Sequence, residues 1–165
     1  MITITQLHKE HAKAYHELRL KGLMEAKEAF GSSYEEESLL PLSHYENQLD
    51  DLNNTVLGAW SNEKLVGILL LRRSNHMKTK HNGHLHAMYV DRDVQKQGIG
   101  KALLVKMIDI TNNIGIINIF LTVTKTNHEA IKLYESVGFH IYGTEKREIL
   151  IDGKYLDSLL MALYH

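Results

Sequence analysis

The feature that most constrains this chain is a pair of glycines, Gly98 and Gly100, placed between two ordered segments. Residues 84–90 have the pattern of a strand, and residues 98–113 carry apolar side chains at helical spacing. Two glycines in these positions let the backbone approach a ligand and leave consecutive N–H groups free. The following helix adds its unpaired N–H groups and the positive end of its dipole, so the turn favours a phosphate or pyrophosphate ligand.

The residues around this turn separate it from two other phosphate-binding turns. No Gly-Lys-Ser or Gly-Lys-Thr follows, which excludes a Walker loop, and Leu103 stands where a dinucleotide fingerprint has its third glycine. Lys96 and Lys101 supply positive charge in a chain whose net charge is only -1. A glycine-rich turn between a strand and a helix, with no ligand, is the alternative interpretation.

The rest of the chain predicts seven strands and four helices in one domain over residues 1–165, since no repeat or linker interrupts it. Strands are expected at 2–5, 55–60, 65–73, 84–90, 116–124, 139–151 and 155–163, and helices at 11–29, 43–52, 98–113 and 127–137. The hairpin turn at 61–64 predicts antiparallel pairing early in the chain. Later, strands alternate with single helices, which predicts parallel pairing in part of the sheet.

Charge and cysteine content exclude several kinds of function. Lys and Arg number 19 against 20 Asp and Glu, a balance that argues against binding nucleic acid or an anionic membrane by bulk charge. The absence of Cys excludes a disulfide framework, a thiolate metal site and a Cys nucleophile. Histidines gather at 76–86 without a suitably placed acid, so no metal site is predicted. No signal peptide or membrane span is visible, and a cytoplasmic protein is expected.

The turn and its surroundings resemble a known family. Gln95-x-x-Gly98-x-Gly100 is similar to the acyl-CoA signature of the GNAT superfamily of N-acetyltransferases. The segment 88–90 resembles the end of the family's fourth strand, and 127–139 resembles its second conserved segment, although Arg92 stands where many members have Pro. The resemblance implies an α/β (α+β) GNAT fold, a mixed central sheet of about seven strands with four helices, in which strands 4 and 5 splay apart.

The resemblance also implies acetyl-CoA as co-substrate, bound in the gap between those two strands, and no metal. The backbone of Met88, Tyr89 and Val90 would bind the pantetheine arm. The pyrophosphate would be held by the amides of Gln95, Lys96, Gln97, Gly98, Ile99, Gly100 and Lys101. Asn127 would contact the pantetheine, and it is also a good N-cap for the helix that follows.

The catalytic candidates are a proton donor and a proton acceptor. The resemblance points the Tyr134 hydroxyl at the thioester sulfur, where a weak acid suffices because a thiolate leaves readily. The alternative for Tyr134 is a core aromatic on the apolar face of its helix. His84 stands where many members have a Glu base, and His86 lies on the same face of the strand. Water can replace either histidine, and a strand-edge histidine without a catalytic role is the alternative.

The acceptor site is less clearly marked. The family's acceptor pocket is lined by the segment between its first two helices, which makes Phe30 and Tyr34 candidate walls. The acidic run 35–37 is expected to be for the most part a solvated turn, as charge runs usually are. The predicted final hairpin around 152–153 borders either the acceptor site or an interface between two copies, so a homodimer stays open.

The resemblance implies an N-acetyltransferase that moves an acetyl group from acetyl-CoA to a primary amine, and the sequence favours direct attack in a ternary complex. No Cys can carry the acetyl group, and no Ser-His-Asp arrangement stands out. The expected acceptor is a small-molecule amine, with no nucleic-acid or membrane partner. The alternatives are a protein N-terminal or lysine acetyltransferase, another acyl-CoA donor, or a non-catalytic acyl-CoA-binding sensor.

Overall fold

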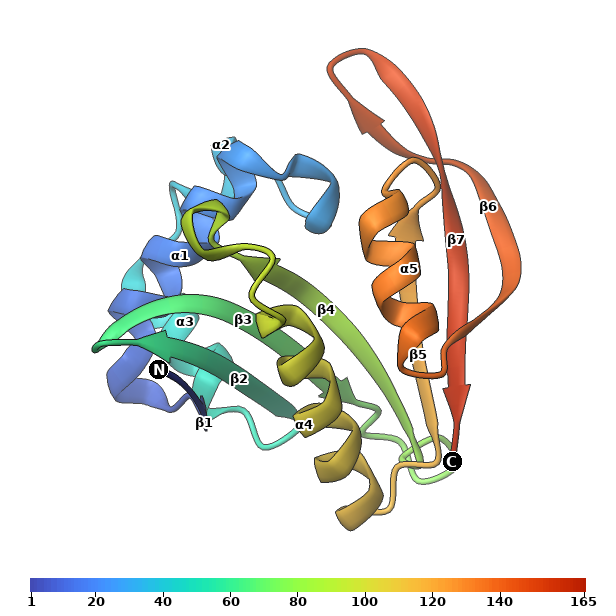
Figure 1. Ribbon diagram of the computed structural model, residues 1–165, viewed down its shortest axis with the longest axis horizontal. Helices are drawn as coiled ribbons and strands as arrows, with labels where there is room; N and C mark the ends of the chain where they lie inside the picture. Colours follow the sequence, from blue (N-terminus) through green and yellow to red (C-terminus); the bar gives the residue numbers. More distant parts are fainter.

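The computed structural model describes residues 1–165 as one seven-stranded sheet with helices on both faces (Figure 1). The strands are β1 (Ile2–Gln6), β2 (Asn54–Ser61), β3 (Lys64–Arg73), β4 (Asn82–Val90), β5 (Asn118–Thr124), β6 (His140–Ile151) and β7 (Lys154–Tyr164). The helices are α1 (Ala12–Glu25), α2 (Tyr34–Glu37), α3 (Leu42–Asp50), α4 (Ile99–Asn113) and α5 (His128–Ser136). The predicted fold class is confirmed, with one short helix, α2, beyond the four expected.

The sheet has the order β1-β2-β3-β4-β5-β7-β6 and is mixed, as predicted. All neighbouring strands are antiparallel except β4 and β5, which run parallel. These two strands pair only from Asn82 with Asn118 to His84 with Phe120. Beyond that point they diverge, and Figure 1 shows the gap between them widening away from the C-terminus. The predicted splay of strands 4 and 5 is therefore present.

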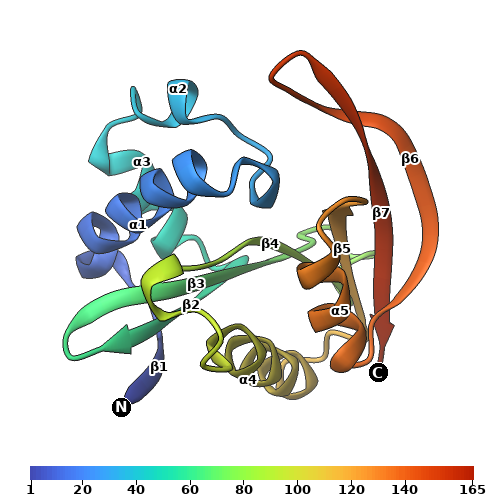
Figure 2. The ribbon, with the colours of Figure 1, turned by 45° about the horizontal axis from the view of Figure 1, so that its top comes forward.

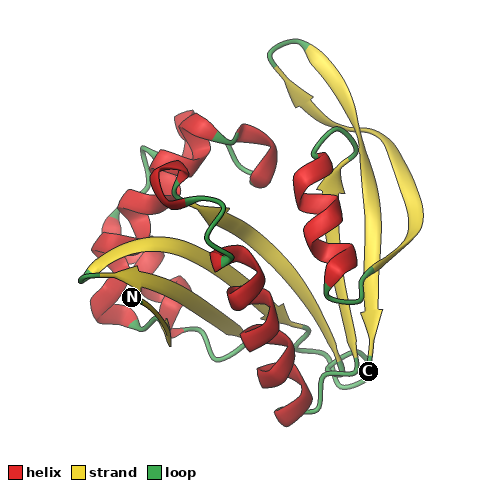
Figure 3. Ribbon diagram, in the orientation of Figure 1, coloured by secondary structure: helices red, strands yellow, loops and turns green.

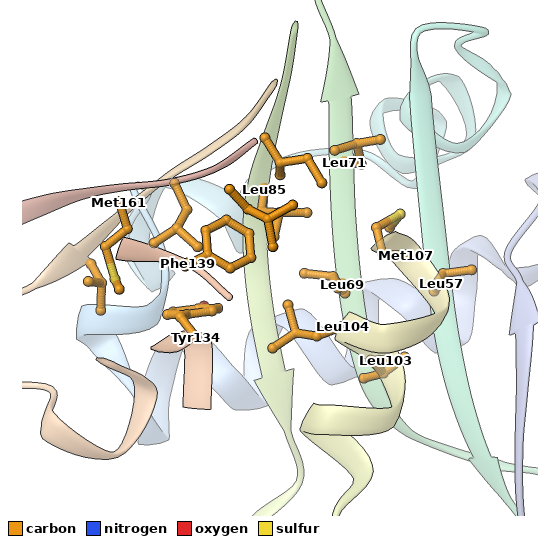
Figure 4. Packing of buried hydrophobic residues seen from close by; sticks show 14 of the residues in the cluster. Leu57, Leu69, Leu71, Leu85, Leu103, Leu104, Met107, Tyr134, Phe139 and Met161 are labelled. Atoms are coloured by element: carbon orange, nitrogen blue, oxygen red, sulfur yellow. The ribbon is translucent and has the colours of Figure 1, made fainter. Parts of the chain in front are cut away.

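The helices form two layers, one on each face of the sheet (Figures 2 and 3). Helices α1 and α3 pack with β2 and β3 around a buried cluster of 13 residues that includes Tyr15, Tyr45 and Ile68. On the other face, α4 and α5 cover a cluster of 20 residues, in which Tyr134 lies near Phe139 (Figure 4). None of the helices combines the length and apolar character that a bilayer-spanning segment needs.

Several boundaries differ from prediction for local reasons. Helix α1 ends at Glu25 rather than at 29, because the backbone turns at Ala26, and a separate 3-10 helix over Lys27–Ala29 follows. Helix α3 begins at Leu42, one residue before the predicted start at 43, and Pro41 is its N-cap. Both predicted two-residue hairpin turns are present, at 62–63 and 152–153, and all four of their residues have positive φ.

The acidic run at 35–37 is only partly a solvated turn. It forms α2, capped by the Ser33 hydroxyl, and two of its carboxylates are exposed. Glu37 departs from the expectation because it is buried against Arg19, with Nε–Oε1 and Nη2–Oε2 distances of 2.9 and 2.6 Å. The Tyr45 hydroxyl also donates to Glu37 at 2.8 Å. One acid of the run therefore ties α1, α2 and α3 together.

Candidate active site

The edge of the gap is shaped by a bulge in β4. Ala87 has a φ of 54°, and the pairing register with β3 shifts there. Before the bulge, His86 lies on the α1 face of the sheet, while after it Met88 packs against the α4 cluster. Tyr89 and Val90 still pair with β3, but no β5 residue pairs with them on the other side. Backbone groups at 88–90 thus face the gap without a strand partner.

The glycine turn follows β4 after a short 3-10 helix over Arg92–Val94. Lys96 and Gly98 both have left-handed conformations, with φ of 67° and 75°, and α4 begins at Ile99. The Gln95 side chain closes the turn by donating to the Val90 carbonyl at 3.1 Å. A Cβ on Gly100 would lie 3.2 Å from Met88 Cε, so this glycine allows α4 to approach β4 closely. The first N–H groups of α4 have no acceptor within the helix and are therefore available to an anion.

A groove of about 640 Å³ runs along this turn. It is lined by ten of the residues that the sequence predicted for the co-substrate: Met88, Tyr89, Val90, Gln95, Lys96, Gly98, Ile99, Gly100, Lys101 and Asn127. Gln97 is exposed and does not line the groove. Asn127 caps α5 by accepting from the Ala130 N–H at 3.3 Å, which confirms its predicted capping role. Leu133 also lines the groove, although the sequence did not mark it as a binding residue. Its position is explained by the helical spacing of α5.

A second cavity, of about 460 Å³, continues from Met88 through the gap to the α1 face of the sheet. Tyr134 and His84, the two predicted catalytic residues, both line it. Tyr134 is 7% exposed and packs edge-on against Phe139. Burial alone raises the pKa of its hydroxyl, and no hydrogen bond within the chain contributes. A neutral, unpartnered O–H group at the wall of a cavity is available to a ligand.

The two histidines of β4 lie side by side on the cavity wall. The rings of His84 and His86 stack with centroids 6.4 Å apart, and His84 also contacts the Phe120 ring. Both side chains are partly exposed, but partial desolvation at the cavity wall lowers the pKa of His84, and desolvation together with neighbouring positive charges lowers that of His86. Both imidazoles are therefore neutral at pH 7 and can accept a proton. Thr122, opposite them on β5, has no basic group.

The predicted acceptor walls occupy different positions. Phe30 lines both the cavity of about 460 Å³, which we call the inner cavity, and an adjoining outer cavity of about 600 Å³. Tyr34 lines only the outer cavity. The Arg19 guanidinium lies over the Phe30 ring, with its Cζ atom 5.1 Å from the ring centroid. Gly22 leaves room for this ring, since a Cβ at position 22 would lie 2.7 Å from it. Glu148, on the final hairpin, lines both of these cavities.

Residues that sequence reasoning missed include Arg72, which lines the inner cavity from β3. It pairs across the ladder with His84. Its signal was the polar end of an otherwise apolar strand, which marks a surface position but not which surface.

Comparison with known proteins is consistent with this geometry. Residues 19–139 match the Acetyltransferase (GNAT) family. The chain belongs to this family. It is 39% identical over 74 residues to the L-amino acid N-acetyltransferase AaaT of Escherichia coli (strain K12), covering 44% of this chain and 46% of AaaT. It is 42% identical over 76 residues to the [ribosomal protein bS18]-alanine N-acetyltransferase of the same strain, covering 45% and 50%. The chain thus matches about half the length of these curated relatives.

The GNAT chain also superposes on solved structures over nearly its whole length. The structure of yncA from Salmonella typhimurium with its cofactor acetyl-CoA has a TM-score of 0.82 at 21% identity, covering 99% of this chain and 94% of that one. At this level of identity the likeness concerns the fold alone. The fold includes the open gap between β4 and β5 in which the two cavities meet.

Proposed function

We propose that residues 1–165 form a single-domain N-acetyltransferase that transfers the acetyl group of acetyl-CoA directly to a primary amine. The observation that carries the proposal is Tyr134, a buried side chain whose hydroxyl makes no hydrogen bond within the chain and lies at the wall of the cavity that passes through the sheet. The AaaT and bS18-alanine acetyltransferase names support an amine acceptor, since one names amino acids and the other a protein alanine.

The groove along the glycine turn fits acetyl-CoA by its chemistry. Left-handed Lys96 and Gly98 and the start of α4 present N–H donors where a pyrophosphate needs them, and Lys101 adds charge. The free backbone edge at 88–90 can hydrogen-bond an amide-containing arm as an added strand would. Bound acetyl-CoA supplies a thioester, whose acetyl group is activated toward amines.

The side chains of the inner cavity then provide the proton transfers. A carbon–nitrogen bond forms and the carbon–sulfur bond breaks, so the amine loses a proton and the sulfur gains one. Neutral His84 and His86 are placed to accept the amine's proton, directly or through water. Tyr134, which keeps its proton because burial raises its pKa, donates to the departing sulfur. Backbone N–H groups of the bulged β4 polarise the carbonyl.

The test is release of free CoA thiol from acetyl-CoA in the presence of a panel of primary amines and short peptides. We expect acceleration by at least one amine, and Tyr134→Phe should lower kcat about 100-fold with little change in acetyl-CoA affinity. Tyr142→Phe is the control, because Tyr142 lies on β6 against Phe120 and lines none of the three cavities.

Two results would overturn parts of this proposal. Binding of CoA without acceleration by any amine would leave a non-catalytic acyl-CoA sensor as the function. Unchanged turnover in Tyr134→Phe would refute the assignment of Tyr134 as the proton donor, but not the proposed acetyltransferase activity. Preference for a peptide N-terminus would favour the alternative named by the bS18-alanine relative.

A further inference from the structure

The inner cavity is lined by one positively charged side chain that no acidic group of the chain neutralises. Arg72 is an exposed residue near the end of β3 whose side chain lines the cavity. The five ion pairs of the protein all lie elsewhere, and the Arg72 guanidinium makes no hydrogen bond within the chain. Its neighbour Arg73 differs, because its Nε donates to the Lys80 carbonyl at 2.8 Å and it lines none of the three cavities.

The groups around Arg72 do not offset its charge. His84 lies directly opposite on β4, His86 follows one step along the same face, and both imidazoles are neutral at pH 7. Arg19, the other arginine of the cavity, is already paired with buried Glu37. Arg72 is therefore the free positive charge of the inner cavity.

The cavity's two remaining carboxylates, Glu28 and Glu148, belong to other segments. Arg72 sits beside His84, the last residue of β4 that pairs with β5, and hence at the closed end of the gap. Glu28 lies at the open end, where its carbonyl accepts from Thr124, the last residue of β5. Glu148 reaches the cavity from β6. The cavity is thus positive at its closed end and negative toward its opening.

We infer that the acceptor is an amine that also carries a carboxylate, and that Arg72 binds this carboxylate. The inference rests on the proposed function and names its substrate class. A guanidinium presents paired N–H donors that match the two oxygens of a carboxylate, and it keeps its charge at any relevant pH. The ammonium end of such an acceptor is attracted to the side of Glu28 and Glu148, and the acid end to Arg72. Arg72 is then a specificity-determining residue with no part in the proton transfers.

The experiment compares matched acceptors that differ only in the acid. Glycine, β-alanine and 4-aminobutanoate are each assayed against their primary amides, with acetyl-CoA saturating. We expect kcat/KM for the best acid to exceed that of its amide by about tenfold or more, the effect of one hydrogen-bonded charge. Arg72→Gln should abolish this preference, because kcat/KM falls much more for the acid than for its amide. Arg73→Gln, the control, should keep the preference.

The outcomes separate the two proposals. Equal rates on acids and amides in the wild type, or an equal loss on both in Arg72→Gln, would overturn the inference alone. Absence of acetylation of every amine would overturn the proposed function and the inference with it. Thermal unfolding of Arg72→Gln should match the wild type, because the side chain makes no bond that folding depends on.

Discussion

Removal of one partner of the Arg19–Glu37 pair should destabilise the protein strongly. Both side chains are nearly excluded from water, with 9% and 5% of their surface exposed, and two hydrogen bonds of 2.9 and 2.6 Å join them. Glu37→Leu leaves a buried guanidinium without a counterion and the Tyr45 hydroxyl without its 2.8 Å acceptor. Breaking such a pair costs about 3–5 kcal/mol, which lowers Tm by about 10 °C in a chain of this size.

The measurement is urea and thermal unfolding of Glu37→Leu, Arg19→Met and the double variant. The double variant should recover most of the loss, because no unpaired buried charge remains. Lys27→Met is the control, since its ion pair with Asp152 is exposed and should contribute about 0–1 kcal/mol. Losses below about 1 kcal/mol in both single variants would refute the reasoning.

This pair also makes a prediction about acid stability with a definite sign. Burial by itself raises the pKa of Glu37, but the hydrogen bond and charge of Arg19 outweigh it and the pKa is lowered below 4.5. A carboxyl with a lowered pKa in the folded state stabilises the protein above its unfolded pKa, and this contribution is lost as the pH falls through the lowered value. The acid transition of the double variant should therefore lack this component.

Two further predictions concern the site. Gly98→Ala and Gly153→Ala should each cost about 1–2 kcal/mol of stability, because both glycines have nearly the same positive φ, 75° and 76°, with no atom near the added Cβ. Only Gly98→Ala should also weaken CoA binding by calorimetry, and equal CoA affinity in the two variants would contradict the phosphate role of the turn. The acid limb of the kcat/KM profile should lie below pH 6.5, since both cavity histidines have lowered pKa values and serve as bases in their neutral form. His86→Gln combined with His84→Gln should remove that limb, and a limb that persists unchanged would assign it to another group.

The parts of the site that the sequence predicted are those with local signals. The turn at 95–101 lies in one continuous segment, and its glycines directly indicate an unusual backbone conformation. Asn127 likewise has its capping function within three residues of itself. Tyr134 reaches the cavity because helical spacing places it on the buried face of α5.

The parts that escaped prediction depend on distant contacts. Arg19 and Glu37 are 18 residues apart in the sequence. The sequence alone does not distinguish Glu37, which is buried in an ion pair, from the two exposed glutamates beside it. The bulge at Ala87 has no sequence signal, because alanine gives no hint of a positive φ. Simple alternation would have put Met88 on the same face as His86, whereas the bulge turns it toward α4.

The limited pairing of β4 with β5 has a consequence for motion. Only three residue pairs, at 82–84 and 118–120, join the two halves of the sheet, so this short ladder is a natural hinge. The two halves are expected to open and close by small rotations about this hinge. Amides on the inner edges of the gap should therefore exchange with deuterium faster than those of the longer β2–β3 ladder. A ligand strand that fills the gap would bridge the halves and slow that exchange, making one sheet mechanically continuous only while it is bound.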